Sequence, residues 1–82
     1  MSTSPVKVEP LAVNVSFPPG EESLVVRRAD GRKISVPLAW FPRLAQASSE
    51  ERMNYSFIGD GVHIHWPLID EDLSVTGLLR AA

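Results

Sequence analysis

The clearest alternation of apolar and polar residues lies in the last third of the chain. Val62, Ile64 and Trp66 alternate there with the polar residues His63 and His65. Successive side chains of a β-strand point to opposite faces of a sheet, so this period of two is typical of a half-buried strand. The pattern predicts a strand whose apolar side faces the core and whose histidines lie on the other side.

A hairpin is predicted around the dipeptide Asp60-Gly61, which precedes this strand. The dipeptide favours a two-residue type I′ turn, because both central positions of that turn need a positive φ. A partner strand is therefore expected over residues 55–58. The turn sets the cross-strand pairs, which are Tyr55 with Trp66, Phe57 with Ile64, Ser56 with His65 and Ile58 with His63.

A second hairpin is predicted around Asp30-Gly31, between strands over residues 24–29 and 32–38. With a two-residue loop, the expected pairs are Val25 with Val36, Arg27 with Ile34, Val26 with Ser35 and Arg28 with Lys33. The tip is basic, since it carries Arg27, Arg28, Arg32 and Lys33. Charged residues of this kind protect a sheet edge from aggregation, and they could also contact an acidic partner.

The remaining segments predict one further strand and short helices. Val13, Val15 and Phe17 share one face of a strand over residues 13–17. A helical segment is expected from Trp40 to Ala45, where Pro42 fits only in the first turn. A capping box from Ser48 to Glu51 predicts the start of another helix. A last, apolar helix is expected over residues 75–80, with Asp72 or Ser74 as its N-cap and Asp70-Glu71-Asp72 in the loop before it.

These elements predict an α+β fold. It is a small, mostly antiparallel sheet built from two β-hairpins plus an extra strand, with short helices on one side. Residues 1–11 are expected to form a flexible tail, with an edge strand at Val6 and Val8. Residues 12–82 form a single small domain, for which an 82-residue chain is long enough.

The composition removes several classes of protein from consideration. The chain contains no cysteine, so disulfides and thiolate chemistry are excluded, as is usual in a reducing cytoplasm. No apolar run is long enough to cross a membrane, and the first residues do not resemble a signal peptide. The net charge of −2 makes nucleic-acid binding by this chain alone unexpected. We therefore expect a cytoplasmic protein.

Catalytic chemistry is not predicted. The serines lie at caps, turns and strand faces, and the chain has neither a nucleophile elbow nor a glycine-rich phosphate loop. A weak metal site remains as an alternative, because His63 and His65 share one strand face and Asp70 could supply a third ligand. The simpler interpretation is two histidines hydrogen-bonded on an outer face. We expect no enzyme activity and no cofactor.

Trp40 and Phe41, followed by Arg43, are candidates for a binding surface, because aromatic residues and arginine dominate binding hot spots. The alternative is ordinary core packing, and both hold if one ring lies inside and the other outside. The face bearing His63 and His65 is the second candidate. So small a domain gains from a protein partner or from a second copy of itself.

The order of several motifs resembles a bacterial family of domains of unknown function, DUF2442. The motifs are ADGRKISVPLAWFPRL, then A-x-x-EER-x-NY, then G-x-HIHWPLIDEDLSVTGLL, and they cover roughly residues 13–79. The resemblance implies a small α+β domain without established catalytic residues. Some members of the family are fused to a helix-turn-helix domain, which implies regulation, and others are encoded beside small toxins, which implies an antitoxin-like role.

The expected function is therefore that of a small intracellular protein-interaction module, a regulatory or antitoxin-like partner of another small protein. The alternative is a metal- or small-ligand-binding domain that uses His63, His65 and nearby carboxylates. This chain contains no helix-turn-helix pattern of its own, so the resemblance gives no reason to expect direct binding to DNA.

Overall fold

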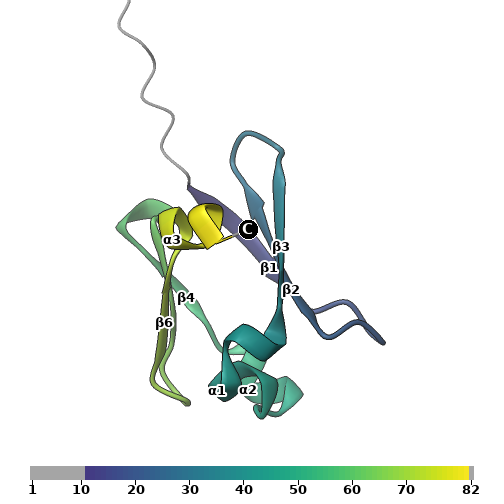
Figure 1. Ribbon diagram of the computed structural model, residues 1–82. Coiled ribbons are helices and arrows are strands. Elements are labelled where there is room, and N and C mark those ends of the chain that lie inside the picture. Colours follow the sequence, from purple (N-terminus) through teal and green to yellow (C-terminus); the bar gives the residue numbers. More distant parts are fainter. Residues whose placement is uncertain (1–10, 82) are drawn as a thin grey trace, which may run out of the picture.

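Six short strands and several helical turns make up the domain (Figure 1). The computed structural model describes residues 11–81, so the edge strand expected at Val6 and Val8 lies outside the described residues. The elements are β1 (Ala12–Ser16), β2 (Ser23–Arg28), β3 (Lys33–Pro37), η1 (Leu38–Trp40), α1 (Pro42–Ala45), α2 (Ser49–Met53), β4 (Ser56–Ile58), η2 (Gly59–Gly61), β5 (His63–Trp66), β6 (Glu71–Ser74) and α3 (Val75–Ala81).

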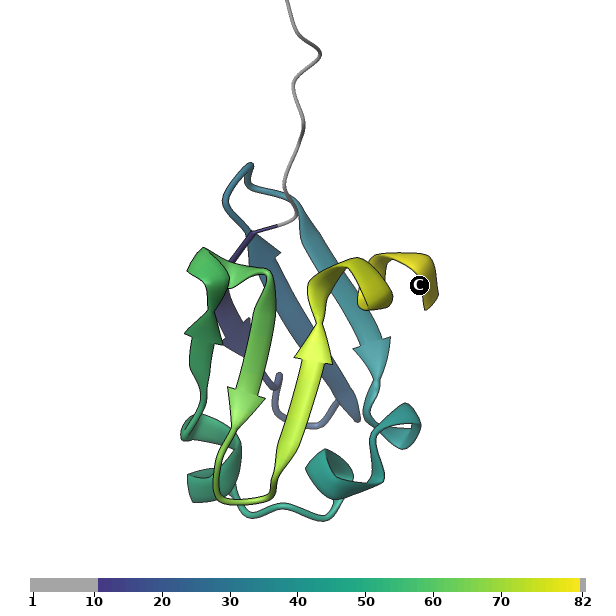
Figure 2. The same ribbon diagram turned by 90° about the vertical axis from the view of Figure 1, so that its left-hand side faces the viewer.

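The strands form two antiparallel three-stranded sheets, in the orders β1-β2-β3 and β4-β5-β6. The α+β class is confirmed, but the two hairpins belong to different sheets instead of one. The sheets face each other, with α3 near one end of the space between them and α1 and α2 near the other (Figures 1 and 2). The helices therefore do not cover one side of a single sheet, because each sheet covers the apolar face of the other.

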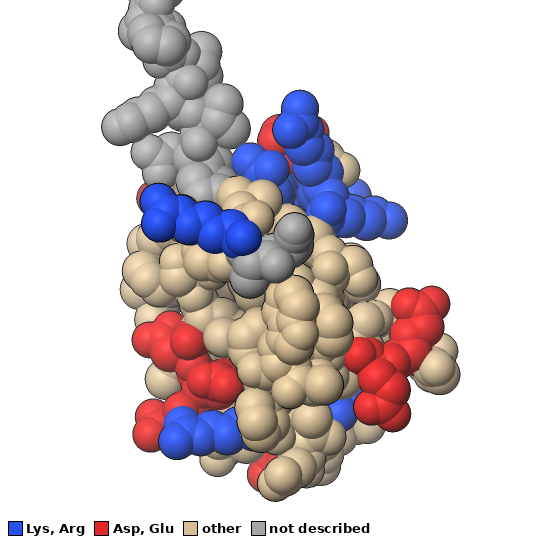
Figure 3. Space-filling view, in the orientation of Figure 1, with Lys and Arg blue, Asp and Glu red and all other residues tan. Residues whose placement is uncertain are grey.

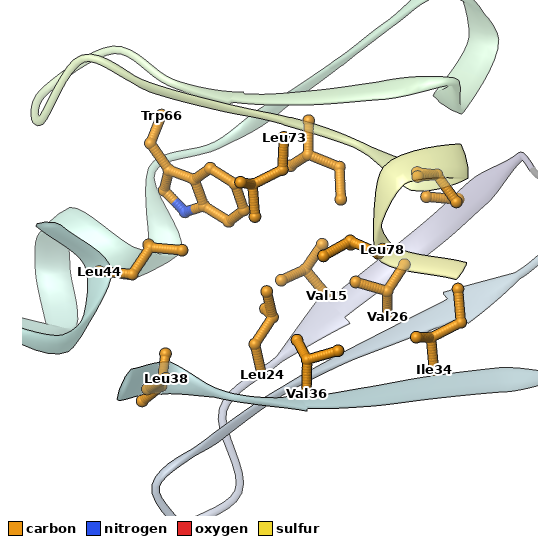
Figure 4. Close-up of a cluster of buried hydrophobic side chains, with 13 residues drawn as sticks. Val15, Leu24, Val26, Ile34, Val36, Leu38, Leu44, Trp66, Leu73 and Leu78 are labelled. Carbon is orange, nitrogen blue, oxygen red and sulfur yellow. The ribbon is translucent and has the colours of Figure 1, made fainter. Parts of the chain in front are cut away.

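The core lies between the sheets, and Figure 4 shows side chains from both of them pointing toward one another. Trp66 is completely buried in this core. The buried apolar side chains come from both sheets and from the helical segments η1, α1 and α3. They are Ala12, Val15, Leu24, Val26, Ile34, Val36, Leu38, Leu44, Ile64, Trp66, Leu73, Val75 and Leu78.

The hairpin of β4 and β5 has the predicted register, with Phe57 opposite Ile64. Asp60 and Gly61 occupy the turn with φ of 59° and 107°, as a type I′ turn requires. The turn also lies against β1. A Cβ atom placed on Gly61 would be 2.5 Å from the carbonyl oxygen of Ala12 and 2.7 Å from its nitrogen. Only glycine fits there.

The register predicted for β2 and β3 is wrong by one residue. Val26 pairs with Ile34 and Arg27 with Lys33, because the loop holds three residues instead of two. The N–H of Gly31 donates to the carbonyl of Arg28 at 3.0 Å, and Gly31 itself has a φ of 91°. A turn followed by a glycine in this region is the usual three-residue hairpin loop. Arg28 consequently points inward and is 8% exposed.

Two strands differ from their sequence pattern. The register of β1 against β2 shifts between Ala12 and Asn14, so Val13 is an extra residue and is exposed instead of sharing a face with Val15. Glu71 and Asp72, expected in a loop before a helix, begin β6 instead. This strand pairs with β5, and its Leu73 enters the core opposite Ile64.

The helical segments agree with their capping signals. Ser48 caps α2 through the predicted capping box, since its hydroxyl accepts the N–H of Glu51 and the Glu51 carboxylate accepts the N–H of Ser48. Pro42 occupies the first turn of α1. The Ser74 hydroxyl accepts the N–H of Gly77 at the start of α3. Within residues 11–81, no helix has the length and hydrophobicity needed to cross a membrane.

Candidate functional site

Trp40 is the most exposed aromatic residue of the domain. It ends η1, a turn fixed on both sides by backbone hydrogen bonds: the N–H of Leu38 donates to Glu22 at 2.9 Å, and the N–H of Phe41 donates to Leu38 at 2.8 Å. Leu38 is buried, Phe41 is half-buried against the core, and Trp40 is 49% exposed. One ring therefore lies inside and the other outside.

The surface around η1 is uncharged over a broad area. Figure 3 views the side of the molecule on which β3, β6 and α3 lie, and its central part carries neither cations nor carboxylates. Acidic groups lie to the left and to the right of this area in the same view, and cations lie beside it at the lower left and at the upper left. We call it the Trp40 face, defined by Trp40, Phe41 and Pro42 of η1 and α1. An uncharged centre with a charged border is typical of a protein-binding surface.

Arg43 has a structural contact that the sequence did not reveal. Its Nη1 donates a hydrogen bond to the backbone carbonyl of Asp70, in the loop between β5 and β6. Asp70 has a φ of 53°, which L-residues seldom adopt outside turns. The contact ties α1 to sheet β4-β5-β6. Arg43 therefore helps to shape the end of the domain next to the Trp40 face, in addition to any contact with a partner.

His63 and His65 lie on the outer face of the second sheet, away from the core. Their cross-strand neighbours are Ser74 and Asp72 on β6, and Ile58 and Ser56 on β4. His63 is exposed and His65 is half-buried. Among the side chains of the described residues, no three of the His, Asp and Glu type gather closely enough to hold a metal ion. The structure therefore does not bring Asp70 together with the two histidines as a metal site.

A groove that the sequence did not indicate runs between the β1–β2 loop and the helical segment. Its volume is about 410 Å³. It is lined by Phe17, Pro18, Pro19, Gly20, Glu21, Glu22, Leu38, Ala45, Ser49 and Arg52. Glu21 and Glu22 line it on the side of the β1–β2 loop, and Arg52 lines it on the side of α2. The groove is therefore polar, whereas small-molecule sites are mostly lined by apolar side chains.

Arg52 holds the wall of this groove in place. Its Nε donates to the carbonyl of Leu44 at 2.9 Å, and its Nη2 donates to the carbonyl of Ala45 at 3.1 Å. Its guanidinium also lies 5.3 Å from the ring centre of Phe17, a cation–π distance. In addition, the indole N–H of Trp66 donates to the Arg52 carbonyl at 3.0 Å. Arg52 thus joins α1, α2 and the core, and its role is structural.

Serine and histidine side chains are the groups to consider here as a nucleophile and a base. Ser48 and Ser74 use their hydroxyls as helix caps. The two histidines have Ile58 and Ser56 on β4 and Ser74 and Asp72 on β6 as their strand neighbours, so a serine lies opposite each histidine.

The comparisons with known proteins agree with the fold and leave the activity open. No curated protein matches the sequence. A crystal structure of a protein of unknown function from Rhodospirillum rubrum ATCC 11170 is similar, with a TM-score of 0.76 and 26% sequence identity. The match covers 90% of this chain and 89% of that one. The family model described as "Protein of unknown function (DUF2442)" matches residues 12–82, and the chain therefore belongs to the DUF2442 family.

Proposed function

We propose that this domain is a protein-interaction module whose partner covers the Trp40 face. The observation that carries the proposal is the half-exposed indole of Trp40 on a turn fixed by hydrogen bonds. In contrast, Trp66 is fully buried, and Phe17, Phe41, Tyr55 and Phe57 all pack against the core. A large aromatic ring on a backbone that is already fixed requires ordering of its side chain alone when a partner buries it.

The partner would be another small protein in the cytoplasm, which the domain regulates or neutralises in an antitoxin-like manner. The resemblance of the chain to proteins encoded beside small toxins supports this choice of partner. The border of the Trp40 face carries both acidic groups and cations, which favours a partner whose own apolar patch is bordered by charges of both signs. A second copy of this chain is the other candidate for covering the same surface.

The test compares three tagged forms of the protein in affinity capture from the lysate of its own host. The wild type should retain one protein in stoichiometric amount, and Trp40→Ala should lose it. Ile58→Ala is the matched control, because Ile58 is 46% exposed and lies on β4, beside His63 on another face. Thermal unfolding of each variant checks that the fold is intact.

The outcomes separate the candidate surfaces. Loss of the partner with Ile58→Ala alone would move the binding site to the face of His63 and His65. Equal retention by the wild type and by Trp40→Ala would refute the proposed surface. An antitoxin-like role further requires that the captured protein stops growth when it is expressed alone and that co-expression of this domain restores growth. If sedimentation instead shows a dimer that Trp40→Ala dissociates, the partner is a second copy.

A further inference from the structure

The β2–β3 hairpin carries three exposed cations close to one another, and two of them form no ion pair with a described residue. Arg27 and Lys33 are directly paired across the two strands, and both are exposed. Two like charges in this position destabilise an antiparallel pair. Arg32 follows at the tip, with 78% of its side chain exposed. In the part of the chain that the structure describes, neither Arg27 nor Lys33 forms an ion pair.

Asp30 supplies the only carboxylate of this hairpin, and other groups occupy it. Its Oδ2 lies 3.5 Å from Nη2 of Arg28, whose side chain is buried beneath the tip, and 3.9 Å from Nε of Arg32. Its Oδ1 accepts the backbone N–H of Arg32 at 3.0 Å. Asp30 thus stabilises the buried Arg28 and the turn. The charges of Arg27 and Lys33 remain uncompensated.

The molecule is consequently divided into a basic end and an acidic remainder. The hairpin holds four cations and one carboxylate, a charge of +3. Since the whole chain carries −2, the remainder carries −5. Figure 3 shows the cations of the hairpin gathered at the upper right, away from the acidic groups lower on the molecule. Such a separation concentrates positive potential at one end and attracts a negatively charged partner.

We propose that the outer face of this hairpin binds a short acidic segment of a protein, with its carboxylates bridging Arg27 and Lys33. Carboxylates fit arginine well, because the planar guanidinium can donate two parallel hydrogen bonds. Asn14 pairs with Arg27 on the neighbouring strand and adds an amide next to the cations. This surface is separate from the Trp40 face, since η1 follows the other end of β3, and the inference goes beyond the proposed function.

A nucleic acid fits this surface less well than an acidic peptide. Its phosphates form a long negatively charged line, which would extend from the small basic hairpin onto the acidic remainder of the molecule. The residues exposed near Arg27 and Lys33 on β1 and β3 include Val13, Asn14, Ser16, Ser35 and Pro37. None of them is aromatic, so bases would find no ring on which to stack.

The probe for the test is a fluorescent peptide of eight glutamates, with a peptide of eight glutamines as the neutral control. Binding is followed by anisotropy at low salt, and amide chemical shifts locate the site. The double variant Arg27→Gln, Lys33→Gln should weaken binding about tenfold, as expected for the loss of two exposed ion pairs. Arg80→Gln, which removes an exposed cation on α3, should leave the affinity unchanged.

A second measurement separates binding from folding. Because Arg27 and Lys33 repel each other in the free protein, Lys33→Gln should raise the melting temperature while it weakens peptide binding. Trp40→Ala should bind the peptide like the wild type, so failure of the proposed function leaves this test intact. Equal binding of the glutamine peptide, shifts that map away from the hairpin, or tighter binding of a single-stranded oligonucleotide would each overturn the proposal.

Discussion

Gly61 offers the sharpest test of how the two sheets meet. Its turn connects β4 to β5 and at the same time presses against the backbone of Ala12 at the start of β1. Alanine at this position faces two obstacles. One is the positive φ of 107°, and the other is a Cβ atom 2.5 Å from a carbonyl oxygen that belongs to the opposite sheet. Backbone atoms cannot move aside as the end of a flexible side chain can.

Gly31 provides the matched control, because it shares the first obstacle and lacks the second. Its φ is 91°, and an added Cβ would meet no atom within 4 Å. Gly31→Ala should therefore cost about 1–2 kcal/mol in the free energy of unfolding, the usual strain of a left-handed residue. Gly61→Ala adds an overpacking term of about 1–3 kcal/mol, which gives a total loss of about 2–5 kcal/mol.

Urea unfolding measures this difference directly, and the fluorescence of the buried Trp66 reports the transition. With a slope of about 1 kcal/mol per molar urea, the midpoint of Gly61→Ala should lie about 1 M or more below that of Gly31→Ala. A domain of this length is stabilised by only about 4–12 kcal/mol in total, so partial unfolding of Gly61→Ala in buffer fits the prediction. Coincident midpoints would show that β1 and the 59–61 turn do not touch in solution.

Two further substitutions test the contacts around α2. Trp66→Phe keeps an apolar ring in the core but removes the indole donor to the Arg52 carbonyl. It should lower the free energy of unfolding, measured by urea titration, by about 2 kcal/mol. An unchanged value would mean that this hydrogen bond does not hold α2. Ser48→Ala removes the capping box and should lower the free energy of unfolding by about 1 kcal/mol. Ser49→Ala, one residue further on, should change it little, and equal effects of the two variants in calorimetry would contradict the assignment of the cap.

The turn residues predicted the register of one hairpin correctly and that of the other incorrectly. Asp60-Gly61 sits in a turn whose type its own residues dictate, so the pairing of Phe57 with Ile64 followed from the sequence. Asp30-Gly31 is the same dipeptide, yet Gly31 follows the turn instead of lying inside it. The choice between a two-residue and a three-residue loop depends on which strand face meets the core. In this domain Leu24 and Val26 are on the core face of β2, and this packing fits the three-residue loop.

Tertiary pairing explains why β6 was missed. Glu71 and Asp72 have low strand propensity, and the segment becomes a strand because it pairs with β5 and places Leu73 in the core. The candidate site shows the same difference between features that neighbouring residues determine and contacts between distant parts of the chain. The inward and outward rings at residues 40 and 41 were foreseen as one alternative, whereas the contacts of Arg43 with Asp70 and of Arg52 with Phe17 span long stretches of chain and leave no local pattern.

Each sheet is built from strands that follow one another directly in the chain, and this arrangement has a consequence for folding. The pairings within a sheet close only short loops, so contact order within each half is low and each half can form its hairpins quickly. The slow step is the docking of two meanders that expose apolar faces until they meet. A chain cut near Ala47, between α1 and α2, would leave both meanders whole, and the two fragments should reassemble as a split protein.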